Sequence, residues 1–101
     1  MKTEAEKKGA LKVWWIPQVP MKAFEVRVSS LAEAKLLLNT LADYDLFQFK
    51  HKVKPDYSNA GGLSVFEYGE WSDWSDDEGN SIDELEIGDC IKLDAKSTPP
   101  Q

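Results

Sequence analysis

The 101-residue sequence has one cysteine, one histidine and no long hydrophobic run. Cys90 alone cannot form a disulfide within the chain, and one cysteine with one histidine cannot by themselves build a Cys/His zinc site. The longest apolar runs, such as residues 13–16, are far shorter than the roughly 18 residues that a membrane-spanning helix needs. No apolar segment of a signal peptide follows the charged N-terminus. We therefore expect a soluble, cytoplasmic protein without cofactor, metal ion or enzymatic activity.

The length and the apolar content suit one small domain. Hydrophobic residues make up 42% of the chain, which is enough for a single core. Residues 1–10 are polar and charged without periodicity, and residues 94–101 end in two prolines. We expect both ends to be disordered and residues 11–93 to form the domain.

Hydrophobic periodicity predicts the elements of the first half. Alternation of apolar and polar residues predicts strands at 11–16 and 24–28. Ser30 and Glu33 have the spacing of a capping box, and an apolar stripe then predicts a helix to about residue 42. A second alternation predicts a third strand at 47–53.

The second half is predicted as a meander of strands. Residues 55–62 are turn formers and predict a loop. Strands are expected at 63–68, 71–76 and 81–85, with the first turn at Gly69-Glu70, whereas residues 85–93 suit either a bulged strand or a tail. The resulting prediction is an α+β fold of order β-β-α-β-β-β, with one helix packed on an antiparallel sheet of about five strands.

Two pairs of tryptophans are separated by an odd number of positions. Trp14 and Trp15 are adjacent on a predicted strand, so their side chains must point to opposite faces of the sheet. Trp71 and Trp74 likewise face opposite ways if their strand has no bulge. At least one tryptophan of each pair is therefore available either as a binding anchor or as a cover for the second face.

Charge is divided unevenly along the chain. Residues 1–54 have a formal charge of +4 and residues 55–101 one of −10. The acidic segment, residues 67–89, holds ten carboxylates and no lysine or arginine. Such a surface repels nucleic acid and attracts a basic protein partner. The residues predicted to bind this partner are Trp71, Asp73, Trp74, Asp76, Asp77 and Glu78.

Three alternatives remain open. The carboxylates can simply solubilise the protein and keep sheet edges apart, or they can imitate DNA and occupy a nucleic-acid-binding protein. In the third alternative, the chain captures a small, nucleotide-like anion. The residues predicted for that ligand site are Lys50, Lys54, Tyr57, Asn59, Gly61 and Gly62.

Three stretches resemble a known family: KVWWIPQVPMKAFEV (12–26), YDLFQF (44–49) and KPDYSNAGG (54–62). The chain is similar over about residues 12–84 to small proteins of tailed bacteriophages and prophages, some of which are labelled superinfection exclusion protein. The resemblance implies a phage accessory protein acting inside a bacterial cell, and it transfers no catalytic or binding residues. Together with the charge pattern it favours a noncatalytic monomer or weak dimer that binds a basic host or phage protein.

Overall fold

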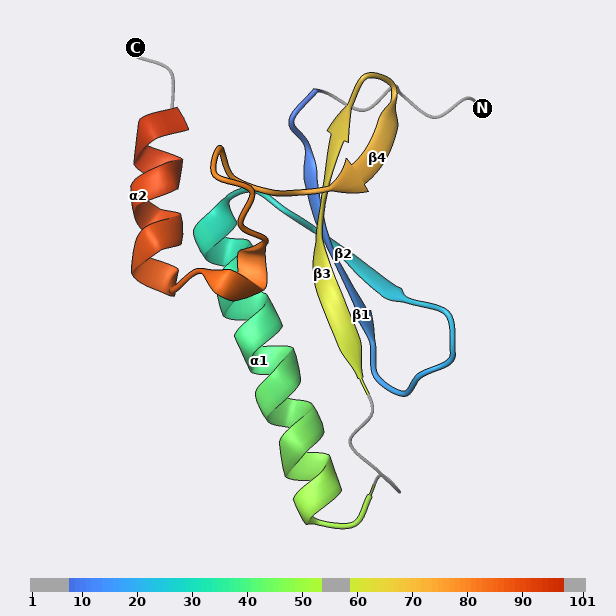
Figure 1. Cartoon of the computed structure of the whole chain (residues 1–101). Coiled ribbons are helices and arrows are strands. Elements are labelled where there is room, and N and C mark those ends of the chain that lie inside the picture. The colour runs from blue at the N-terminus through green and yellow to red at the C-terminus, as the bar shows by residue number, and fades with distance from the viewer. Residues whose placement is uncertain (1–7, 54–58, 98–101) are drawn as a thin grey trace.

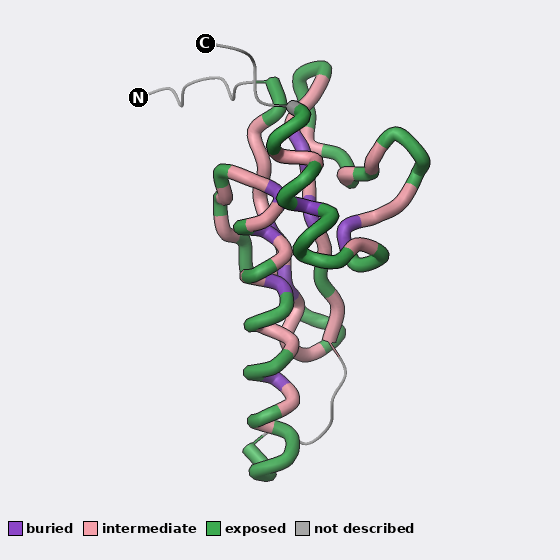
Figure 2. Tube along the Cα trace, turned by 90° about the vertical axis from the view of Figure 1, so that its left-hand side faces the viewer, coloured by how far each residue is buried: buried purple, intermediate pink, exposed green. Residues whose placement is uncertain are grey.

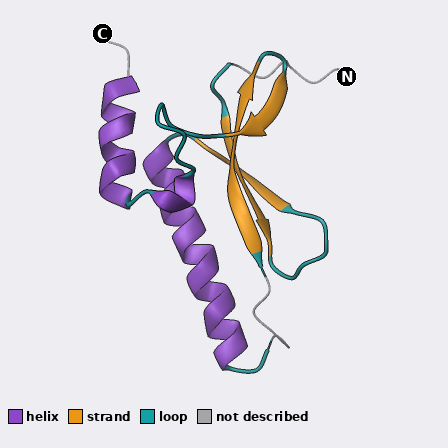
Figure 3. Cartoon of the chain, viewed as in Figure 1, coloured by secondary structure: helices purple, strands orange, loops and turns teal. Residues whose placement is uncertain are grey.

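The computed structural model describes residues 8–53 and 59–97 and shows one long helix packed on one side of a four-stranded sheet, with a second helix packed on the first (Figures 1 and 3). The α+β class is confirmed. The elements are β1 (Leu11–Ile16), β2 (Phe24–Val28), α1 (Leu31–Lys50), β3 (Ala60–Glu67), β4 (Glu70–Asp73), a short 3-10 helix η1 (Ile82–Glu84) and α2 (Ile87–Ser97).

The sheet is antiparallel throughout, with strand order β2-β1-β3-β4. Val13 and Trp15 of β1 lie in the core with Leu63 of β3, which the register places opposite Val13. This side, toward α1, is called the covered face. Because side chains alternate along a strand, Lys12 and Trp14 lie on the other side, which is called the open face.

The beginning of α1 is fixed by three side chains. Ser30 caps the helix by accepting a hydrogen bond from the Glu33 amide (3.1 Å), as the capping-box spacing predicts. Glu33 reaches back to the Ser29 amide (2.6 Å), one residue earlier than expected. Asp94 of α2 accepts hydrogen bonds from the amides of Leu31 (2.8 Å) and Ala32 (2.9 Å). The helix thus begins with its first amides paired, two of them by a distant segment.

The strand predicted at 47–53 is wrong, because α1 continues to Lys50 and is capped by His51. Asp45 lies on the buried side of the helix, so a carboxylate stands where the apolar stripe would continue. Phe47 and Phe49 are instead exposed, at 56% and 41%. The alternation that suggested a strand therefore comes from aromatic residues that point to solvent.

The C-terminal elements also differ from the prediction. Residues 81–85 contain η1 rather than a strand, and residues 85–93 lead into α2 rather than a strand or tail. Asp89 accepts a hydrogen bond from the Glu86 amide (3.0 Å) and so holds the first turn of α2. Cys90 is fully buried against the core. The sheet consequently has four strands instead of about five, and a second helix packs on α1.

Smaller boundaries move as well. The turn between β3 and β4 is Tyr68-Gly69, where both residues have positive φ, one position earlier than predicted. Gly9 and Ala10 exchange backbone hydrogen bonds with Phe66, so the pairing begins before residue 11. At the other end, α2 includes residues 94–97, which were expected in a tail. Residues 1–7 and 98–101 lie outside the described residues.

Candidate functional site

Each adjacent tryptophan of β1 packs on an adjacent glycine of β3. The register places Trp15 opposite Gly61 and Trp14 opposite Gly62. A methyl group at Gly61 would overlap the Trp15 ring, and one at Gly62 would come within 2.8 Å of Trp14 Nε1. The two glycines were predicted in a loop but belong to β3. Because they have no side chain, they leave room for the two indoles as these are placed in the structure.

On the covered face, Trp15 is fixed by a buried carboxylate. Its Nε1 donates to Asp45 Oδ2 at 2.9 Å, and Asn59 Nδ2 donates to the same oxygen at 3.1 Å. Asp45 is only 3% exposed, and its burial therefore depends on such hydrogen bonds. This arrangement joins the second half of α1 to β1 and to the residue before β3. The sequence analysis missed it because the predicted helix ended at about residue 42, which left Asp45 between that helix and the strand predicted at 47–53.

On the open face, Trp71 of β4 is surrounded by an aromatic ring and two cations. Phe66 meets it edge-on with ring centroids 5.3 Å apart. Lys12 Nζ lies 4.4 Å and Arg27 Cζ 5.1 Å from the centroid of Trp71, distances typical of cation–π contacts. The basic residues of β1 and β2 thus extend over the open face toward the acidic segment.

The residues predicted to bind a partner do not form one surface. Trp71 lies on the open face, whereas Trp74 follows the end of β4 and packs against the core. Asp73, Asp77 and Glu78 are exposed. The strands predicted at 71–76 and 81–85 do not form a hairpin in the described structure, where residues 76–80 form a tight loop between β4 and η1.

Asp76 holds that loop together. Its carboxylate accepts hydrogen bonds from the amides of Glu78 (2.9 Å) and Asn80 (2.8 Å) and from Asn80 Nδ2 (3.2 Å). The Asn80 amide is the main reason that the pKa of Asp76 lies below its usual value. In the described structure, Asp77 and Glu78 accept no such bonds. Only the latter two are therefore available to a partner without rearranging the loop.

A small hollow joins the open face to the acidic segment. This Trp14 hollow has a volume of about 150 Å³ and lies beside β3, beyond the point where β4 ends. Its exposed carboxylates are Asp73 and Asp83, and the latter accepts a hydrogen bond from Ser81 Oγ at 2.5 Å. The lining residues are Trp14, Gly61, Gly62, Leu63, Asp73, Trp74, Ser81, Ile82 and Asp83. Of these residues, the sequence analysis assigned Asp73 and Trp74 to the partner site and Gly61 and Gly62 to the alternative ligand site, but it assigned Trp14 and Asp83 to neither.

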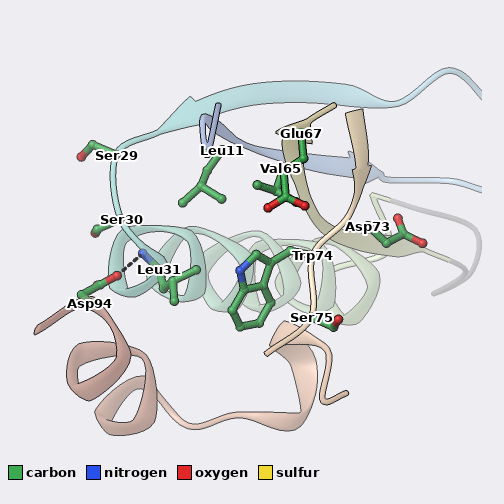
Figure 4. A pocket seen from close by; sticks show the side chains of 11 residues that line it. Leu11, Ser29, Ser30, Leu31, Val65, Glu67, Asp73, Trp74, Ser75 and Asp94 are labelled. Atoms are coloured by element: carbon green, nitrogen blue, oxygen red, sulfur yellow. Dashed lines mark hydrogen bonds between the residues drawn. The ribbon is translucent and has the colours of Figure 1, made fainter. Parts of the chain in front are cut away.

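A larger pocket of about 410 Å³ lies at the beginning of α1 (Figure 4). Leu11, Val65, Trp74 and Asp94 are among its lining residues. A helix N-terminus generally attracts anions. Here the Asp94 carboxylate already accepts from the first two amides of α1, as the dashed line to Leu31 shows, so the pocket offers an anion little attraction.

The residues of the alternative ligand site are placed for other roles where the structure describes them. Lys50 is the exposed last residue of α1, and Asn59 donates to Asp45. Gly61 and Gly62 lie beneath the two indoles. Lys54 and Tyr57 lie outside the described residues, so the site as a whole stays a prediction.

The side chains most suited to catalysis are also engaged. His51 Nδ1 lies 2.9 Å from the Phe47 carbonyl oxygen, and its ring contacts that of Phe47 at a tilt of 34°, with 4.2 Å between centroids. Burial raises the pKa of the Cys90 thiol, which makes the reactive thiolate scarcer. Within residues 8–53 and 59–97, no three acidic, histidine or cysteine side chains gather in a way that could hold a metal ion.

Comparison with known proteins identifies the family. The family model described as superinfection exclusion gene product 17 matches residues 10–92. The superinfection exclusion protein of Salmonella phage P22 is 54% identical over 57 residues, which are 56% of this chain and 55% of that protein. The match thus spans about half the length of this relative. No solved structure matches. Neither helix of the described residues is long and apolar enough to cross a bilayer. The chain belongs to the superinfection exclusion gene product 17 family of phage proteins.

Proposed function

We propose that this protein acts in superinfection exclusion as a noncatalytic binding protein in the host cytoplasm. Its partner is a phage or host protein with a basic surface, bound through the exposed carboxylates of the acidic segment. The observation that carries the proposal is the Trp14 hollow, where Asp73 and Asp83 line the same small space as an indole ring. Family membership supports the biological role, and the hollow supports the mode of binding.

The chemistry of the hollow suits a lysine or arginine side chain. Carboxylates form charge-assisted hydrogen bonds with a guanidinium or ammonium group, and an indole face attracts a cation by ~0.5–2 kcal/mol. Pockets for drug-sized ligands usually span roughly 300–1,000 Å³. At about 150 Å³, the Trp14 hollow is better matched to one side chain of a partner than to a free metabolite.

The surrounding charge would guide the partner to this hollow. Eight of the ten carboxylates of the acidic segment are exposed. Several also hold local structure: Asp83 and Glu84 accept hydrogen bonds from Ser81, and Asp89 from the Glu86 amide. Asp73, Asp77 and Glu78 have no such role in the described residues. These three carboxylates can therefore be reversed in charge with little effect on the fold.

Plaque formation on cells that express the protein provides the functional test. We expect Asp73→Lys to raise plaquing by a superinfecting phage toward the level on cells without the protein. Asp43→Lys, at an exposed position of α1, makes the same charge change away from the hollow and should leave exclusion intact. Normal exclusion by a folded Asp73→Lys variant would overturn the proposed site.

A direct binding test uses a short peptide of alternating arginine and glycine. We expect it to shift the NMR resonance of the Trp14 indole N–H and to bind more weakly as salt is raised. Asp73→Lys should reduce the shift, whereas Asp43→Lys should not. A peptide that leaves the Trp14 resonance unchanged while shifting that of Trp71 would move the binding site to Trp71 on the open face.

A further inference from the structure

β2 is an edge strand with little protection against pairing. Within the described residues it hydrogen-bonds to β1 on one side, and no strand lies on its other side (Figure 1). Its sequence, Phe-Glu-Val-Arg-Val (Phe24–Val28), contains no lysine, proline or bulge, and its two charged residues, Glu25 and Arg27, have opposite signs and so do not repel a second copy of the strand as a run of like charges would. Among the described residues, this edge of the sheet is therefore not paired with another strand.

Apolar surface also continues across this edge on the covered face. Phe24 of β2 and Leu36 of α1 are both 58% exposed. Between β2 and α1 lies the edge groove, with a volume of about 320 Å³. Figure 2 shows that exposed positions recur along α1 on the side away from the purple core positions. The residues lining the edge groove are Val26, Arg27, Val28, Glu33, Leu36, Leu37 and Thr40.

We propose that β2 pairs antiparallel with β2 of a second copy of this chain, about a two-fold axis at Val26. In this register each Glu25 stands opposite Arg27 of the second copy, and each Phe24 opposite Val28. Opposite charges and aromatic–β-branched pairs are both favourable between neighbouring strands. The five residues are thus complementary to themselves, as an interface between two identical subunits requires.

The same pattern disfavours the neighbouring registers. A pairing centred on Glu25 places the two Glu25 carboxylates opposite each other, and a pairing centred on Arg27 does so with the two guanidiniums. Like charges directly opposite destabilise a sheet. A register shifted by one residue is worse, because residues of the covered face of one copy would then stand opposite residues of the open face of the other. The register centred on Val26 is therefore selected by charge and by face.

The dimer would have one eight-stranded sheet with both α1 helices on the same side. The two edge grooves would then adjoin over the new pair of strands, and Leu36 and Phe24 of each copy would lose solvent exposure. Glu25 already contacts Lys12 at 3.4 Å, and Arg27 lies over Trp71. The new cross-strand pairs lie on the same open face, so they extend this network of charges without burying an isolated ion.

Analytical ultracentrifugation over a range of concentrations tests the proposal. The full chain should sediment as a dimer that dissociates on dilution. Glu25→Arg or Arg27→Glu alone places like charges opposite each other and should weaken the dimer about tenfold. The exchange of both residues restores opposite charges and should recover the dimer. Glu70→Arg makes the same charge change on β4, the other edge strand, and should have no effect.

Disulfide trapping tests the register independently. Val26→Cys places two thiols at the two-fold axis, within reach of an S–S bond, and mild oxidation should give a covalent dimer. Val28→Cys is the matched control, because its thiol would face Phe24 of the second copy, and the same oxidation should give no covalent dimer. A monomer at every concentration, or a dimer that neither the charge variants nor the cysteine positions affect, would overturn the proposal.

Discussion

On each face of the sheet a tryptophan packs on a glycine, but the surroundings of the two pairs differ. On the covered face Trp15 is 7% exposed, packs on Gly61 and donates its N–H to buried Asp45. On the open face Trp14 is only half-buried, packs on Gly62 and lines a hollow with two carboxylates. The Trp15 indole has its hydrogen-bond acceptor and its packing partners within the protein, whereas the Trp14 indole lines a hollow that can take a side chain of a partner. Trp15 thus serves the stability of the fold, whereas the proposed recognition uses Trp14.

Truncation of the two tryptophans should show the largest difference. We expect Trp15→Ala to lower the free energy of unfolding by ~3–5 kcal/mol, because it leaves a cavity in the core and removes the donor to Asp45. Trp14→Ala should cost less than half as much and should instead weaken binding of the arginine peptide. Urea unfolding with an unchanged m value provides the measurement. Equal losses of stability would mean that the open face is as much a part of the core as the covered face.

The prediction from sequence succeeded where a pattern is local. The strands at 11–16 and 24–28, the capping box at Ser30 and the opposite directions of adjacent tryptophans all follow from neighbouring residues. The strand predicted at 47–53 is wrong because buried Asp45 interrupts the apolar stripe, and two of its partners, Trp15 and Asn59, come from elsewhere in the chain. Local patterns do not contain such distant partners.

The same limit applies to α2 and to the candidate site. Cys90 is the residue of α2 that is buried in the core, and Asp94 of α2 caps α1. Neither residue type by itself indicates a helix. The Trp14 hollow brings together residues from β1, β3 and the segment after β4. A usable signal was nevertheless present: two adjacent glycines can accommodate two adjacent large rings on opposite faces of a sheet.

Substitution of the two glycines should give a smaller difference in the same direction. We expect Gly61→Ala to lower stability by ~1–3 kcal/mol, because the new methyl group overlaps a Trp15 ring that is fixed in the core. Gly62→Ala meets Trp14, whose ring can shift on the open face, and alanine also costs the strand less conformational entropy. Its net effect on stability should stay within ~1 kcal/mol. Thermal unfolding of the two variants side by side provides the measurement, and a larger loss for Gly62→Ala would contradict the assignment of the faces.

The smallest effect is expected in the loop that connects the two faces, between Trp74 on the core and Ser81 beside the Trp14 hollow. The Asn80 amide lowers the pKa of Asp76 in the folded protein, so this carboxylate stabilises the fold above the usual aspartate pKa of ~3.9. That contribution is lost as the pH falls through the lower folded pKa. The contribution of Asp76 to stability should therefore be nearly constant between about pH 7 and 5 and fall below about pH 4.

Asp76→Asn should reduce this acid-dependent loss, whereas Asp77→Asn, which removes a carboxylate without hydrogen bonds in the described residues, should leave it almost unchanged. The free energy of unfolding in urea at a series of pH values gives both slopes. Glu33, whose pKa is lowered mainly by the Ser29 amide, contributes a second acid-sensitive step that both variants retain. If Asp76→Asn and Asp77→Asn have the same slope, the loop does not hold its shape through Asp76, and the hollow beside it depends on the packing of Trp74 and Ile82 instead.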